Sequence, residues 1–175
     1  MGDEHPIAGR TMKEYSHVGI EHATFGAGCF WGVEARFGEV SGVIETAVGY
    51  EGGGLEHPTY KEVCSDRTGH AEVVEVVFDN SRVSYETLLD TFFSLHDPTQ
   101  LNRQGPDWGT QYRSVIFTQN DEQAAAARAK VAELQASGVF AKPIMTVIEP
   151  SKGFWKAEEY HQKYLEKRGM VSCHI

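Results

Sequence analysis

Period-two alternation of apolar and polar residues predicts the strands of this chain. The clearest cases are residues 43–50 and 71–78, which are rich in β-branched side chains at alternating positions. Two shorter runs, residues 22–25 and 112–118, also have the character of strands. Gly26-Ala27-Gly28 ends the first of these runs and marks a turn.

Helical spacing of apolar residues predicts the segments between these strands. Residues 29–40 place Phe30, Val33 and Phe37 on one face. Ser84 is a favoured residue for the start of a helix, and the apolar residues that follow it to position 95 share one face. The predicted order through residue 118 is therefore β-α-β-β-α-β.

That order is the split βαβ pattern of ferredoxin-like folds, so the predicted fold class is α+β. We expect a two-layer sandwich core with helical and loop extensions. The extensions are a helix at 120–138, a strand at 143–148 and a helix at 154–168. The whole chain, 1–175, is expected to form one domain, with an irregular arm at 1–20 and a mobile tail at 169–175 that carries Cys173.

Composition adds constraints on the class of protein. A chain of 175 residues with 41% hydrophobic residues suits one globular domain. The net charge of −9 argues against a nucleic-acid partner, which would require clustered basic residues. No apolar run approaches the roughly 20 residues of a membrane span, and the N-terminal residues do not resemble a secretory signal. We therefore expect a cytoplasmic protein without a membrane partner.

The three cysteines, Cys29, Cys64 and Cys173, narrow the chemistry further. Their odd number does not suggest a disulfide framework, and no Cys-x-x-Cys pair suggests structural zinc. We expect no metal and no cofactor. The thiols are then either inert and buried, or they take part in redox or nucleophilic chemistry.

Cys29 occupies the most informative position, where a strand ends and a helix begins. Helix N-termini present free N–H groups and a partial positive charge, which favour a thiolate. The flanking glycines allow close approach of a ligand, and Phe30 and Trp31 add an apolar wall. A buried structural cysteine in an aromatic-rich helix start is the alternative interpretation. The loops at 51–69 and 96–111 are longer than usual, which favours a functional role for them.

The segment Gly28-Cys29-Phe30-Trp31-Gly32 resembles the signature of the peptide methionine sulfoxide reductase A (MsrA) family. Four more blocks agree with that family in order and spacing, and the resemblance covers roughly residues 20–165. These blocks are His57-Pro58-Thr59-Tyr60, Thr68-Gly69-His70-Ala71-Glu72, Gly109-Thr110-Gln111-Tyr112-Arg113-Ser114 and Ala157-Glu158-Glu159-Tyr160-His161-Gln162.

The resemblance implies a role for each matching residue. Cys29 would attack the sulfur of methionine sulfoxide, specifically the S epimer, and Glu72 would donate a proton to the oxygen. The other matching residues would bind the substrate: Phe30 and Trp31 its methyl group, Tyr60 and Tyr112 its sulfoxide oxygen, and Asp107 its main chain. The same resemblance implies a resolving role for Cys173, through a disulfide with Cys29 that thioredoxin reduces. The substrate would be oxidised proteins or free methionine sulfoxide, and the enzyme is expected to be a monomer.

Some residues remain open to other interpretations. Cys64 competes with Cys173 as the resolving thiol, or it is a small buried hydrophobic residue. Without the resemblance, Glu72 would be taken as solvated, Tyr60 and Tyr112 as surface residues, and Asp107 as a turn former. His161 is expected to pack or to support the site, and His70 to bond within a loop.

Two other function classes are consistent with parts of the pattern. A cysteine hydrolase could use the helix N–H groups for an oxyanion, but the sequence ties no histidine to Cys29. A binding module for oxidised methionine would not need a resolving thiol.

Overall fold

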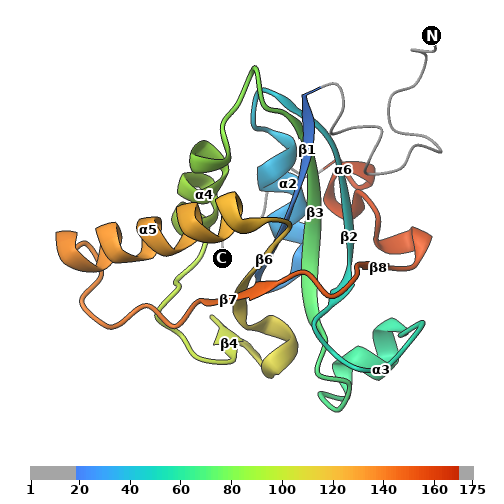
Figure 1. Ribbon diagram of the computed structural model, residues 1–175. Helices are drawn as coiled ribbons and strands as arrows, with labels where there is room; N and C mark the ends of the chain where they lie inside the picture. The colour runs from blue at the N-terminus through green and yellow to red at the C-terminus, as the bar shows by residue number, and fades with distance from the viewer. Residues whose placement is uncertain (1–18, 170–175) are drawn as a thin grey trace, which may run out of the picture.

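A computed structural model of the chain describes residues 19–169, and Figure 1 shows their arrangement. Within this part, six strands form one sheet in the order β7-β6-β1-β3-β2-β8. Their bounds are β1 (Ile20–Ala27), β2 (Val43–Glu51), β3 (Ala71–Asp79), β6 (Ser114–Thr118), β7 (Val147–Pro150) and β8 (Trp155–Lys156).

The four central strands have the predicted split βαβ topology. β3 lies between β1 and β2 and is antiparallel to both, so β1 and β2 run parallel to each other without being neighbours. β6 pairs antiparallel with the other edge of β1. The sheet is then extended by β7, parallel to β6, and by β8, antiparallel to β2. The predicted α+β class and its ferredoxin-like core are confirmed.

Helices α2 (Phe30–Gly38) and α4 (Tyr85–Ser94) pack on one face of this sheet, as Figure 1 shows. The core between the layers is aromatic. Phe25 of β1 stacks on Phe37 of α2 at 4.9 Å and on Phe92 of α4 at 5.3 Å between ring centroids. All three rings are fully buried. This packing fixes α2 and α4 against β1.

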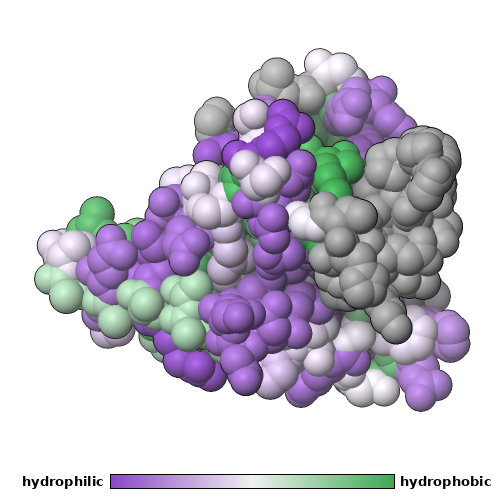
Figure 2. Space-filling view, turned by 45° about the horizontal axis from the view of Figure 1, so that its top comes forward, coloured by the Kyte–Doolittle hydropathy of each residue, from purple (hydrophilic) through white to green (hydrophobic). Residues whose placement is uncertain are grey.

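The predicted helix at 120–138 is confirmed as α5 (Asp121–Ser137), with Asn120 at its start. Gly138 ends it at φ 74, a left-handed conformation in which glycine carries no steric penalty. α5 packs against α4 and β7, and its far end projects from the body of the molecule (Figure 1). The face turned forward in Figure 2 is largely hydrophilic, in keeping with the acidic composition.

Both long loops contain short elements that the hydrophobic pattern does not predict. The first holds α3 (Tyr60–Cys64), which begins with a capping box between Thr59 and Glu62. The second holds the hairpin β4 (Arg103–Gln104) and β5 (Asp107–Trp108), followed by the 3-10 turn η1 (Thr110–Tyr112). The strand expected at 112–118 therefore begins only at Ser114. The strand expected at 143–148 lies later, as β7, where it pairs with β6.

The prediction of one helix over residues 154–168 is wrong. This segment forms β8, a 3-10 turn η2 (Glu159–His161) and a short helix α6 (Tyr164–Lys167). Long-range bonds override the local pattern, because the Gln162 side chain bonds the backbone N–H and C=O of Val48 at 2.9 Å each. Lys163 adopts φ 55, which no continuous helix permits.

The expected arm at 1–20 and tail at 169–175 fall almost entirely outside the described residues; Gly19 and Gly169 border them, and Ile20 already belongs to β1. Within residues 19–169, no helix is both long and apolar enough to cross a membrane.

Candidate active site

Cys29 stands at the junction of β1 and α2, at the position before the first helical residue. The turn into it depends on Gly28, which has φ 96 and lies against Gln104 of β4. A Cβ atom at position 28 would approach the Gln104 side chain to 2.9 Å. Gly28 therefore allows the β4–β5 hairpin to pack closely against the turn that leads into Cys29.

The thiol of Cys29 is half-buried, and its electrostatics correct the expectation of a resting thiolate. Burial, reinforced by the charges of Glu72 and Asp107, raises the pKa of Cys29 to about 12. The backbone N–H groups of Trp31 and Gly32 lower it, as the helix start predicts, but removal from water outweighs them. Cys29 therefore rests as a thiol in the free protein.

Glu72 lies beside this thiol, near the start of β3, with only 1% of its surface exposed. Its Oε1 accepts the backbone N–H of Phe30 at 3.1 Å. Burial raises the pKa of Glu72 to about 8, although the bond from Phe30 opposes the shift. At pH 7 the carboxyl is mostly protonated. The interpretation of Glu72 as a solvated residue is therefore wrong. Glu72 is a buried neutral acid that lies beside the start of α2.

Tyr60, Tyr112 and Asp107 converge on the same place from both long loops. Burial, followed by the charge of Glu72, raises the pKa of each tyrosine, so both hydroxyls remain donors. Asp107 acts electrostatically on both Cys29 and Glu72. The structure therefore brings these five predicted residues into one electrostatically coupled cluster, with one member or more from each loop.

The aromatic wall is divided between Phe30 and Trp31. Phe30 is buried, with its ring 5.8 Å from Tyr50 and 6.4 Å from Tyr60. The indole Nε1 of Trp31 donates to Nδ1 of His161 at 3.0 Å, and the His161 ring lies 5.2 Å from Phe30. Because Nδ1 accepts, the neutral His161 carries its proton on Nε2, and burial lowers its pKa. The supporting role expected for His161 agrees with these contacts.

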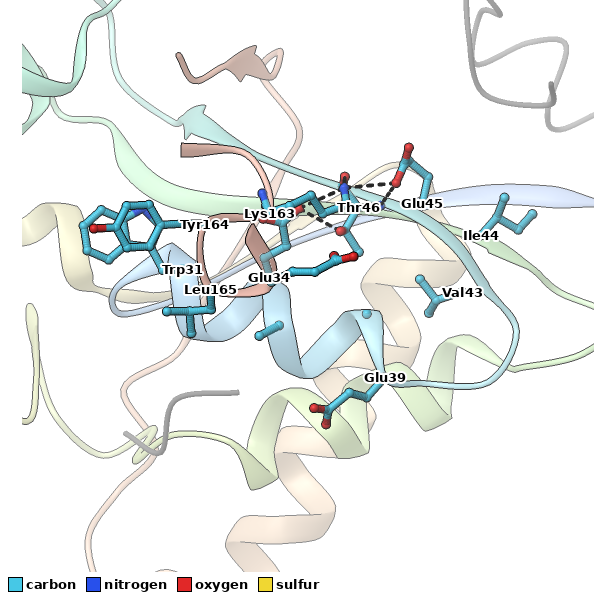
Figure 3. Close-up of a pocket in the computed structure, with 13 residues that line it drawn as sticks. Trp31, Glu34, Glu39, Val43, Ile44, Glu45, Thr46, Lys163, Tyr164 and Leu165 are labelled. Carbon is cyan, nitrogen blue, oxygen red and sulfur yellow. Dashed lines mark hydrogen bonds and ion pairs between the residues drawn. The ribbon is translucent and has the colours of Figure 1, made fainter. Parts of the chain in front are cut away.

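A charged network anchors the C-terminal segment to α2 (Figure 3). Glu34, 3% exposed, accepts the backbone N–H of Lys163 at 2.8 Å and its Nζ at 3.2 Å. Nζ also bonds the carbonyl oxygen of Thr46 at 2.6 Å. Beside this network, Tyr164 stacks on Trp31 with ring centroids 3.7 Å apart. The last described helix, α6 (Tyr164–Lys167), is therefore held against Trp31, which lies two positions after Cys29 in the sequence.

Of the other two cysteines, the structure describes only Cys64. Cys64 is exposed at the end of α3, so its interpretation as a small buried residue is wrong. The pKa of Cys64 is raised by burial, and the Tyr60 side chain opposes the shift by a hydrogen bond. Cys173 lies outside the described residues.

Sequence reasoning missed Glu158, whose carboxylate joins two aromatic residues of the site. Its Oε1 accepts the hydroxyl of Tyr50 at 2.8 Å, and its Oε2 accepts the backbone N–H of Tyr60 at 2.9 Å. The neighbouring Glu159 is exposed, and nothing in the local pattern distinguishes the two. Only contacts about 100 residues away in the chain do so.

The arrangement combines a thiol with a neutral acid, two phenol donors and an apolar wall. Such a site can attack a polarised atom with sulfur and protonate the oxygen that leaves it. Two of the described histidines bond elsewhere: His70 bonds Gly53 and Leu55, and His161 bonds Trp31. Within residues 19–169, no histidine bonds Cys29 as a hydrolase base would, and no group of three or more acidic, histidine or cysteine side chains is placed to hold a metal ion.

Known proteins are similar to this chain in sequence and in fold. The family model described as peptide methionine sulfoxide reductase matches residues 21–175. A peptide methionine sulfoxide reductase MsrA of Acidobacterium capsulatum is 61% identical over 153 residues, which are 87% of this chain and 98% of that protein.

Solved structures agree with these sequence relatives. Mxr1 from Saccharomyces cerevisiae in reduced form has a TM-score of 0.82 and 37% identity, covering 89% of each chain. Mxr1 in complex with Trx2 has a TM-score of 0.61 and 26% identity, covering 86% of this chain and 88% of that one.

Proposed function

The chain belongs to the peptide methionine sulfoxide reductase A family, oxidoreductases that reduce methionine sulfoxide, and we propose that Cys29 and Glu72 carry out the reduction. The observation that carries this proposal is the bond between the backbone N–H of Phe30 and Oε1 of Glu72 at 3.1 Å. It holds a buried, protonated carboxyl against the residue that follows the nucleophile.

The raised pKa values of both groups suit a reaction that begins from neutral partners. The Cys29 sulfur attacks the sulfoxide sulfur, and the S–O bond breaks. The oxygen takes the proton of Glu72, and the carboxylate so formed accepts the proton of the thiol. The hydroxide so formed adds to the Cys29 sulfur as the new S–S bond breaks. Methionine leaves with the electron pair of that bond, two more electrons than the sulfoxide had, and Cys29 becomes a sulfenic acid.

The remaining site residues orient the substrate. Tyr60 and Tyr112 donate hydrogen bonds to the sulfoxide oxygen, and Asp107 contacts the main chain of the substrate. Phe30 and Trp31 hold the methyl group. With the methyl group held there, the S epimer directs its oxygen toward Glu72. The exclusion of water from this wall strengthens each of these interactions.

A single-turnover assay tests the nucleophile. Wild-type protein mixed with excess methionine S-sulfoxide, without reductant, should form about one equivalent of methionine. Cys29→Ser should form none, because a hydroxyl oxygen is a far weaker nucleophile than sulfur and cannot hold the transferred oxygen as a sulfenic acid does. Cys64→Ser is the matched control and should behave like wild type. Methionine formation by a folded Cys29→Ser protein, with folding checked by circular dichroism, would exclude Cys29.

Regeneration follows from the chemistry of the sulfenic acid. The thiol of Cys173 attacks the Cys29 sulfur, water leaves, and a disulfide remains. A reduced thioredoxin then exchanges with that disulfide. The Trx2 complex of the yeast relative supports this reductant, and the anchoring of α6 beside Trp31, which fixes the chain at Lys167, six positions before Cys173, supports Cys173 as the resolving thiol.

The physiological setting follows from the same cycle. Thioredoxin must be kept reduced, which places the enzyme in the cytoplasm. The substrates are methionine sulfoxide in oxidised proteins and as the free amino acid. The enzyme acts as a monomer in this proposal, since one chain contributes every site residue. Sedimentation at assay concentration tests that state, and a dimer that dissociates only with loss of activity would contradict it.

A further inference from the structure

The carboxylate of Glu158 connects three distant parts of the chain behind the substrate wall. It bonds the hydroxyl of Tyr50 at the end of β2 and the backbone N–H of Tyr60 at the start of α3, while it belongs to the C-terminal segment. The two bonds are 2.8 and 2.9 Å long, the range expected for charge-assisted hydrogen bonds. The side chain is half-buried, so water does not easily replace either partner.

Glu158 remains ionised despite this burial. Burial raises its pKa, but the bonds from Tyr60 and Tyr50, with the proximity of His161, outweigh burial and hold the pKa below its ordinary value. Removal of the carboxylate would leave two donors without a partner, and one of them is the first amide of α3.

Each partner of Glu158 touches the site directly. Tyr50 is fully buried, packs against the Phe30 ring and lies directly opposite Glu72 in the sheet. Tyr60 carries a proposed sulfoxide donor, and its ring lies 4.4 Å from His161, three residues after Glu158. Glu158 thus holds the backbone of Tyr60, and the rings of His161 and Phe30 hold its side chain.

We propose that Glu158 is a positioning residue, which acts through Tyr60 by fixing the start of α3 so that the Tyr60 hydroxyl meets the sulfoxide oxygen. This inference rests on the proposed function, because it requires the Tyr60 hydroxyl to bind the substrate. Glu158 itself contacts neither the substrate nor Cys29. Its effect should therefore disappear when the Tyr60 hydroxyl is absent.

A double-mutant cycle on kcat/KM for free methionine S-sulfoxide, with dithiothreitol as reductant, tests this dependence. Tyr60→Phe should lower kcat/KM roughly tenfold, the worth of one hydrogen bond to a strongly polar oxygen. Glu158→Ala should lower it by a similar factor, mainly through KM, because the lost interaction binds ground state and transition state alike. The double variant should remain near tenfold below wild type.

Three further variants separate positioning from loss of fold. Glu159→Ala is the matched control, since its side chain is exposed next in sequence, and kcat/KM should stay at the wild-type value. Glu158→Gln should restore most of the activity, because the amide oxygen accepts the Tyr60 N–H and its NH₂ donates to Tyr50. Tyr50→Phe leaves the Tyr60 bond in place and should change kcat/KM less than threefold. The rate of Cys29 alkylation by iodoacetamide should be unchanged in all variants.

The outcomes distinguish this inference from the function it rests on. A hundredfold loss in the double variant, or wild-type activity in Glu158→Ala, would overturn the inference while leaving the role of Tyr60 intact. Slower Cys29 alkylation in Glu158→Ala would also overturn it, because the damage would then extend to the nucleophile. Wild-type activity in Tyr60→Phe would refute the tyrosine's proposed role, and the inference with it, without affecting Cys29.

Discussion

Glu72→Gln should make the protein more stable at neutral pH while it slows the reaction. Glutamine has the shape of the protonated acid, and its amide oxygen can still accept the Phe30 N–H. In wild type, the unfolded chain ionises Glu72 above its ordinary pKa of 4.5, whereas the folded protein keeps it protonated up to about 8. Folding therefore takes up a proton between these values. The contribution of Glu72 to stability is complete below pH 4.5 and is lost as the pH rises through 8.

The size of the effect follows from the pH interval. One pKa unit corresponds to about 1.4 kcal/mol, so at pH 7 wild type spends about 3 kcal/mol to keep Glu72 neutral. Glutamine needs no such proton. The free energy of unfolding of Glu72→Gln should exceed that of wild type by up to about 3 kcal/mol at pH 7, less any loss where the amide N–H groups find poorer partners. Near pH 4.5 the advantage should vanish.

Urea unfolding at pH 5, 6, 7 and 8 measures this difference. The ratio of the two unfolding constants should change about tenfold for each pH unit. His96, whose pKa burial lowers to about 4, titrates equally in both proteins and cancels. Glu56→Gln, a change at an exposed loop residue, is the control and should show a constant difference. A constant difference for Glu72→Gln too, or a variant less stable than wild type at pH 8, would refute a buried neutral carboxyl.

Three further predictions concern the cycle and its scaffold. The single-turnover rate of wild type should fall as the pH rises through about 8, because Glu72 then loses the proton that it donates. At pH 7 the rate of Glu72→Gln should be about two to four orders of magnitude lower than that of wild type. A wild-type rate that does not change with pH would show that Glu72 is not the acid. Cys173→Ser should stop after about one equivalent of methionine with thioredoxin and should cycle with dithiothreitol, whereas Cys64→Ser should cycle with both; the reverse pattern would make Cys64 the resolving thiol. Gly28→Ala should lower the single-turnover rate at least tenfold, because its Cβ would meet Gln104 at 2.9 Å and the backbone has φ 96; wild-type kinetics would show that the hairpin adjusts freely.

The spacing of apolar residues predicts those elements whose contacts in the fold match their local sequence pattern. β2 and β3 are rich in the β-branched residues that favour strands, although β3 is buried on both faces, and α5 has an N-cap residue and a C-terminal glycine in its sequence. The segment after residue 154 has helical composition, but Gln162 bonds β2 and Lys163 bonds Glu34 in a left-handed backbone conformation. Such contacts lie more than 100 residues apart, so periodicity could not predict the break.

The candidate site divides in the same way. The position of Cys29 at a helix start follows from the glycines and the apolar spacing around it. The protonation state does not follow, because it depends on how deeply the folded chain buries the thiol and on Glu72, 43 positions away. Glu72 was identified through the family motif alone, and its burial comes from the pairing of β3 between β1 and β2. Glu158 left no local signal, since only its distant partners distinguish it from Glu159.

The most direct test of the catalytic account is the fate of the thiols in one turnover. Protein reduced and freed of reductant has three cysteines, Cys29, Cys64 and Cys173, and is mixed with one equivalent of methionine S-sulfoxide. Thiol titration and peptide mapping should then show one equivalent of methionine, two thiols lost, and a disulfide between Cys29 and Cys173. Methionine formed with all three thiols intact, or a product in which Cys29 is neither oxidised nor bonded, would contradict the account.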